Sequence, residues 1–107
     1  MALELDNLIN RTYKINTIKN NFSTPSIYEQ MAEECSELAQ ALLKKARKIR
    51  NENPTPKTMQ EIDTNITEEF TDVILCACVL DLDFDCFTLD FKLNRWIKRA
   101  ERIDHGF

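Results

Sequence analysis

Glycine is nearly absent from this sequence, since the chain of 107 residues contains one glycine and three prolines. Hairpin turns, phosphate-cradling loops and dinucleotide-binding turns need positive φ angles or a close approach of the backbone, which glycine supplies. Strict apolar–polar alternation, the pattern of a half-buried strand, is also missing over any useful length. These absences argue against the glycine-rich nucleotide-binding folds and predict an all-α domain.

The sequence also lacks the long apolar runs of a membrane protein. No run approaches the roughly 18 consecutive apolar residues of a membrane-spanning helix, and the N-terminus has no apolar stretch like that of a signal peptide. The formal net charge is −4, which gives no reason to expect nucleic acid as a partner. We therefore expect a cytoplasmic protein that binds neither membrane nor nucleic acid.

Patterns of cysteine and histidine that hold metals are missing as well. None of the four cysteines forms a C-x-x-C pair, and the single histidine, His105, lies near the C-terminal end. Zinc sites and disulfide frameworks use more regular spacings. Reduced thiols in a helical core are the favoured interpretation of Cys35, Cys76, Cys78 and Cys86.

Four helical segments can be placed along the chain. Apolar residues make up 43% and charged residues 30%, a balance typical of one folded domain over residues 1–107. Ser26 with Glu29 three residues later, after the helix-breaking Pro25, predicts the start of the second helix. The segments 3–20, 26–51, 58–80 and 86–103 are predicted to form a four-helix, bundle-like domain, with a polar, proline-containing loop at 51–58.

Apolar stripes are expected to face the core in the first and last helices. The expected residues are Leu5, Leu8 or Ile9, Ile15 and Ile18 in the first helix, and Leu89, Leu93, Trp96, Ala100 and Ile103 in the fourth.

The second helix places a carboxylate on its apolar stripe. Met31, Leu38 and Leu42 lie at spacings that share one helix face, and Glu34 occupies the position between them. Glu37 follows one turn later on the same side. This helix therefore carries an i, i+3 carboxylate pair whose first member faces the predicted core.

The third helix repeats this arrangement. Its apolar stripe is interrupted by Glu69, and Asp72 lies three residues further on the same face. The other members of the stripe are Ile62, Ile66, Val73, Cys76 and Leu80. Two helices joined by one loop normally pack antiparallel, so we expect the two carboxylate pairs to face each other.

Four facing carboxylates need compensation, because buried like charges repel each other and lose hydration. They can take up protons, pair with arginine or lysine, or share a divalent cation. Oxygen ligands without histidine or thiolate suit Mg²⁺ or Mn²⁺. A di-iron bundle is disfavoured, since Glu37 and Asp72 stand where that fold needs histidine. The alternative is a set of solvated surface glutamates on two amphipathic helices.

Two short motifs carry a family resemblance. The stretches EECSE (33–37) and EFTD (69–72) resemble the EExxE…ExxD signature of the MazG-like, all-α NTP pyrophosphatase superfamily. The similarity extends over about residues 27–98. The interval between the motifs is long for that family, and Ser36 stands where many relatives have glycine.

The resemblance implies hydrolysis of a nucleoside triphosphate between its α and β phosphates, giving the monophosphate and pyrophosphate. It implies that Mg²⁺, or alternatively Mn²⁺, is held by Glu34, Glu37, Glu69 and Asp72. Glu33 is expected to support these ligands or to orient or deprotonate the attacking water. A homodimer or homotetramer is also implied, with phosphate-binding residues that cross the interface.

The fourth helix offers cations for a triphosphate. Lys92, Arg95 and Arg99 share one face, which Arg102 extends, and Lys92, Asn94 and Arg95 are the expected substrate-binding residues. The alternative is that these cations solubilise the helix and favour its dipole, and we prefer that interpretation for Arg99 and Arg102. Aromatic residues at helical spacing are more often core than base contacts, and we assign Trp96 to packing or to a subunit interface. The candidates for base contact are Phe22, Tyr28, Phe70, Trp96, Gln30 and Asn94.

Two other functions remain open from the sequence. A non-enzymatic helical dimerisation or regulatory module could carry acidic pairs as remnants, although all five acidic positions of the signature are present here. Phosphoribosyl-ATP pyrophosphatase shares the signature, but Gln30 occupies the position where we would expect lysine. The favoured prediction is a Mg²⁺-dependent nucleoside triphosphate pyrophosphohydrolase.

Overall fold

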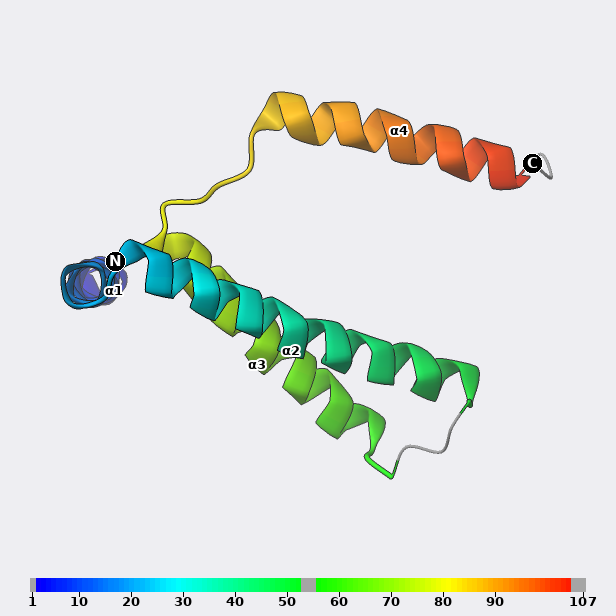
Figure 1. The fold of residues 1–107 in the computed structure, drawn as a ribbon, viewed down its shortest axis with the longest axis horizontal. Coiled ribbons are helices and arrows are strands. Elements are labelled where there is room, and N and C mark those ends of the chain that lie inside the picture. The colour runs from blue at the N-terminus through cyan, green and yellow to red at the C-terminus, as the bar shows by residue number, and fades with distance from the viewer. Residues whose placement is uncertain (1, 53–55, 105–107) are drawn as a thin grey trace.

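All regular structure in the described part of the chain is helical. The computed structural model describes the backbone of residues 2–52 and 56–104, and the side chains of residues 4–52 and 56–103. Its elements are α1 (Ala2–Asn21), α2 (Thr24–Arg50), α3 (Met59–Val79) and α4 (Cys86–Asp104) (Figure 1). No strand occurs among the residues described, so the predicted all-α class with four helices is confirmed. None of these helices combines the length and apolar character needed to cross a bilayer.

Helix α2 begins earlier than the sequence pattern predicted. Ser23 is the N-cap, and its hydroxyl accepts a hydrogen bond from the Ser26 backbone N–H at 3.3 Å. Pro25 lies in the first turn, where a missing N–H costs no intrahelical bond. The predicted capping box of Ser26 with Glu29 is therefore wrong, because the helix begins at Thr24 and Pro25 lies within its first turn instead of preceding it.

The connection from α2 to α3 uses standard helix ends. Asn51 closes α2 in the left-handed conformation, with φ 57°, which asparagine tolerates better than most residues. Thr58 caps α3 in a capping box: its hydroxyl accepts from the Glu61 N–H at 3.2 Å, and the Glu61 carboxylate accepts from the Thr58 N–H at 3.4 Å. Residues 53–55 of the predicted loop lie outside the described residues.

Helices α2 and α3 form the packed part of the molecule, an antiparallel hairpin (Figure 1). The buried residues are Ala41, Ile62, Cys76 and Val79. The predicted stripe of α3 is confirmed, since Ile66, Val73 and Leu80 are half-buried beside the buried Ile62 and Cys76. On α2 the stripe passes from the half-buried Leu38 to Ala41, and Leu42 is 49% exposed. We call the line along which α2 and α3 pack the seam. The prediction for Leu42 is wrong because the seam continues from Leu38 at i+3, which is Ala41, and not at i+4, which is Leu42.

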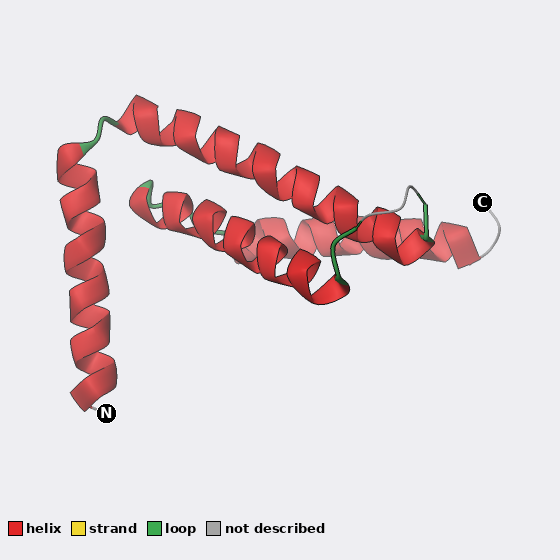
Figure 2. Cartoon of the chain, turned by 90° about the horizontal axis from the view of Figure 1, so that it is seen from below, coloured by secondary structure: helices red, strands yellow, loops and turns green. Residues whose placement is uncertain are grey.

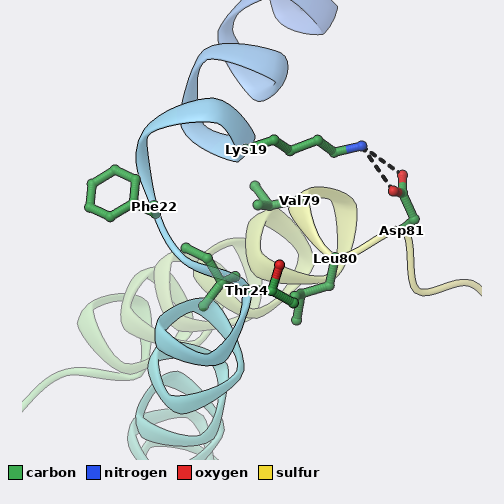
Figure 3. A pocket seen from close by; sticks show the side chains of 7 residues that line it. Lys19, Phe22, Thr24, Val79, Leu80 and Asp81 are labelled. Carbon is green, nitrogen blue, oxygen red and sulfur yellow. Dashed lines mark hydrogen bonds and ion pairs between the residues drawn. The ribbon is translucent and has the colours of Figure 1, made fainter.

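Helix α1 runs across the open end of this hairpin (Figure 2). The Lys19 ammonium pairs with both carboxylate oxygens of Asp81, each at 2.9 Å, at a pocket where α1, α2 and the end of α3 meet (Figure 3). Ile15 and Ile18 are half-buried, whereas Leu5, Leu8 and Ile9 are exposed. The predicted inner side of α1 therefore exists only in its C-terminal half, the part close to the hairpin.

Helix α4 stands apart from the hairpin, at the end of the connecting segment 81–85 (Figure 1). Asp85 starts the helix, since its carboxylate accepts from the Thr88 N–H at 3.1 Å and from the Thr88 hydroxyl at 2.8 Å. All side chains described on α4 are exposed. Its predicted apolar stripe is therefore not buried within one chain, and the bundle is not closed by this helix.

Candidate metal centre

Three carboxylates from the two packed helices converge at the middle of the hairpin. Glu34 and Glu37 come from α2 and Glu69 from α3. One oxygen of each lies within 4.8 Å of the others. Glu34 and Glu69 are half-buried because they occupy the seam, and Glu37 is exposed beside it. The antiparallel packing thus brings together three of the four predicted metal ligands.

The two seam glutamates each keep one oxygen without a partner. Oε2 of Glu34 and Oε2 of Glu69 are buried and accept no hydrogen bond. The other oxygen of Glu34, Oε1, accepts from Nε2 of Gln30 at 2.7 Å. A buried carboxylate oxygen without a donor is costly, so these atoms are placed where a cation would stabilise them.

The charges of the cluster raise the pKa of its members. The hydrogen bond from Gln30 lowers the pKa of Glu34, but desolvation and the negative charges of Glu37 and Asp72 outweigh it, so the net shift is upward. The pKa of Glu37 is raised chiefly because Glu69 can accept its proton and because the charge of Glu69 repels the ionised form. The cluster therefore favours proton or cation uptake.

Asp72 and Glu33 lie at the edge of this centre. Asp72 is exposed and is not one of the three converging residues, yet its charge reaches Glu34 and Glu37 and raises the pKa of both. Glu33 is exposed on α2 and is rotated about 100° from Glu34 around the helix axis. Asp72 thus acts on the cluster through its charge, and Glu33 lies beside the cluster on α2.

The described ion pair within the hairpin does not involve the three glutamates. Lys45 on α2 pairs with Asp63 on α3, across the same seam. Neither of the ion pairs that the structure describes, this one and Lys19–Asp81, includes a carboxylate of the cluster. Protein cations therefore do not neutralise the three glutamates in the described part of the chain.

The predicted substrate-binding residues lie on the separate helix α4. Lys92 and Arg95 line a hollow with Trp96 and Arg99, and the Arg99 guanidinium stacks 4.7 Å from the centre of the Trp96 ring. Asn94 is exposed and does not line this hollow, and Arg102 borders a neighbouring one with Arg95 and Arg99. Because α4 lies apart from α2 and α3, one chain does not bring these residues to the carboxylates (Figure 1).

The side chains considered for base contact and for the core are mostly exposed. Gln30 is engaged with Glu34 and not turned toward a separate ligand. Phe22, Tyr28 and Phe70 are 52–58% exposed, so the preference for placing aromatics in the core is wrong for these three within a single chain. Trp96 is 63% exposed, and its assignment to packing or to a subunit interface stays a prediction. All four cysteines are free, but only Cys76 is buried, where desolvation raises the pKa of its thiol. The prediction of core thiols is wrong for Cys35, Cys78 and Cys86.

Comparisons of this chain with protein-family models, with curated proteins and with solved structures found no match.

Proposed function

We propose that this chain is a metal-dependent nucleoside triphosphate pyrophosphohydrolase. The observation that carries the proposal is the convergence of Glu34, Glu37 and Glu69 within 4.8 Å, from two helices that each bear an i, i+3 acidic pair. The signature-like motifs selected these residues without reference to their positions in space. Two of the three, Glu34 and Glu69, are half-buried between the helices, which distinguishes them from glutamates on the outer surface.

The residues present fit Mg²⁺ or Mn²⁺. All the converging ligands are carboxylate oxygens, and two of these oxygens are buried without a hydrogen-bond partner. Glu34, Glu37 and Glu69 would hold the ion, with Asp72 as the fourth carboxylate. When bound, such an ion neutralises phosphate charge and lowers the pKa of water.

The remaining chemistry falls to the chain's own side chains. Attack on a phosphoryl group depends mainly on positioning and on charge neutralisation. Glu33, one residue before Glu34, would orient or deprotonate the attacking water. Lys92 and Arg95 would bind the negative phosphate oxygens, and Asn94 would contribute a polar contact.

A second copy of the chain is needed to complete this site. Helix α4 carries the cations but leaves its apolar stripe exposed, with Trp96 63% and Ile103 75% accessible. Most of the stability of a helix in a protein comes from the packing of its amphipathic face. We therefore propose a homodimer or homotetramer in which α4 packs on another subunit and brings Lys92 and Arg95 to that subunit's carboxylates.

The experiment is a pyrophosphate-release assay with a panel of canonical and modified nucleoside triphosphates in millimolar Mg²⁺. Glu34→Gln, Glu37→Gln, Glu69→Gln and Asp72→Asn are each expected to abolish metal-dependent release while helical content is kept. Glu68→Gln, the exposed neighbour of Glu69, and Glu101→Gln on α4 are the matched controls and should retain activity. Wild-type turnover in a cluster variant would remove that residue from the ligand set.

The second candidate is a non-enzymatic helical module that dimerises or regulates a partner. The exposed apolar stripe of α4 favours it, since that surface is suited to a protein contact whether or not catalysis occurs. This function predicts assembly of the chain without pyrophosphate release from any nucleotide and without thermal stabilisation by Mg²⁺ or Mn²⁺. The same assay and a thermal melt therefore separate the two functions.

A further inference from the structure

Gln30 is the one neutral side chain with a described hydrogen bond to a carboxylate of the cluster. It lies one turn before Glu34 on α2, and its Nε2 donates to Oε1 of Glu34 at 2.7 Å. The two oxygens of Glu34 consequently differ: Oε1 is occupied by the amide, and Oε2 is buried and free.

We propose that Gln30 is a positioning residue that holds Glu34 so that Oε2, and not Oε1, is presented as the metal ligand. This inference rests on the proposed function, because it assumes that the cluster holds a divalent cation. Gln30 itself contacts neither the cation nor the nucleotide in this arrangement.

The hydrogen bond from Gln30 fixes Glu34 before an ion binds. Glutamate has three rotatable side-chain bonds, so a free Glu34 would lose conformational freedom each time it bound an ion. The amide of Gln30 removes part of that freedom in advance, as donors behind metal ligands commonly do.

The test measures Mn²⁺ binding to the metal-free full chain by titration calorimetry, independently of catalysis. Gln30→Met keeps the length of the side chain and removes the donor, so the Mn²⁺ dissociation constant should rise about tenfold, the lower end of the effect of losing such a partner. Gln40→Met, the same change at an exposed position of the same helix, should leave it unchanged. Gln30→Asn, whose amide is too short to reach Oε1, should behave like Gln30→Met and replaces it if that variant fails to fold.

A double-mutant comparison separates positioning from a general structural role. In a Glu34→Gln background the ligand that Gln30 orients is already altered, so adding Gln30→Met should cause little further loss of Mn²⁺ affinity. Equal affinity of wild type and Gln30→Met, or a full additive loss in the double variant, would overturn the positioning role alone. Absence of Mn²⁺ binding by wild type would instead overturn the proposed function on which it rests.

Discussion

The α2–α3 hairpin and helix α4 are both amphipathic, but only the hairpin satisfies its apolar surface within the chain. The hairpin buries Ala41 and Ile62 almost completely, at 1% and 2% exposure, and keeps its acidic residues at the same seam. Helix α4 has the cations and a continuous apolar stripe, of which nothing is buried. The acidic half of the proposed site thus lies on a hairpin with its own buried core, and the basic half lies on a helix whose apolar stripe is uncovered.

This difference is the reason for proposing that two copies of the chain complete each other's sites. The hairpin is held by its own contacts and can present the three glutamates alone. Helix α4 needs an outside surface before it gains stability from packing, and its basic face needs an anionic partner. Both needs are met if α4 of one copy covers the carboxylate centre of another, as proposed above.

The largest expected effect tests that exchange directly. Glu69→Gln inactivates the acidic half of the site, and a Lys92→Ala/Arg95→Ala double variant inactivates the basic half. If α4 acts on a second subunit of a two-fold symmetric dimer, each mixed dimer contains one intact site and one doubly altered site. After co-refolding equal amounts with random exchange, about half of the dimers are mixed, so about a quarter of all sites should be active. Pyrophosphate release by the mixture, compared with each variant alone, provides the measurement. A mixture as inactive as its components would place α4 on its own hairpin.

The next effect contrasts buried and exposed apolar residues. Ile62→Ala, in the hairpin core, should destabilise the fold by about 2–5 kcal/mol, the usual cost of such a cavity. Leu93→Asp, on the exposed stripe of α4, should instead lower the oligomeric mass in light scattering. The helical content of the hairpin should remain in that variant.

Phe84→Asp is the matched control for Leu93→Asp, since Phe84 is exposed in the segment before α4 and lies outside the stripe. A full oligomer in Leu93→Asp, at the wild-type dissociation concentration, would show that α4 does not form the interface.

The sequence predicted the hairpin and its site better than it predicted the outer helices. Helical periodicity located Glu34 and Glu69 on apolar stripes because the partner helix is local in sequence, across one loop, and both stripes are satisfied by it. The shift from Leu42 to Ala41 could not be read from spacing, since i+3 and i+4 share a face. Pro25 gave an ambiguous signal, because proline both ends helices and occupies their first turns.

The fourth helix shows why the remainder was not predictable. A stripe such as Leu89–Leu93–Trp96 predicts that a surface will be covered but not which chain covers it. The same limit applies to the N-terminal half of α1, where Leu8 and Ile9 are exposed. Gln30 was missed as a partner of Glu34, although its i, i+4 spacing was the available signal.

An intermediate effect concerns stability with and without metal. In EDTA, Glu34→Gln and Glu69→Gln should melt above wild type, because each removes one charge from a repelling, partly buried cluster. In millimolar Mg²⁺ or Mn²⁺, wild type should gain far more than either variant, since a ligand that binds only the native state stabilises it by mass action. Thermal melts of the three proteins under both conditions should therefore cross. Equal metal-induced shifts in all three would favour the solvated surface glutamates.

The smallest effect is a pH dependence of the metal-free protein that has opposite signs in the two regions. In the hairpin, the pKa of Glu37 is raised above its ordinary value of 4.5, mainly by Glu69, so the folded state binds protons more tightly than the unfolded chain does. Its contribution is therefore favourable near pH 4 and is lost as the pH rises through the raised value. At the start of α4, the hydrogen bonds from Thr88 lower the pKa of Asp85 below 3.8, so its contribution is present above that value and is lost as the pH falls.

In EDTA melts from pH 3 to pH 8, Glu37→Gln should match wild type in acid and melt increasingly above it toward neutrality. Asp85→Asn should show the reverse, matching wild type only in acid and melting below it at pH 7. Glu101→Gln, an exposed control, should have the melting temperature of wild type throughout. A difference in melting temperature between Glu37→Gln and wild type that does not change with pH would mean that the repulsion at the seam is absent.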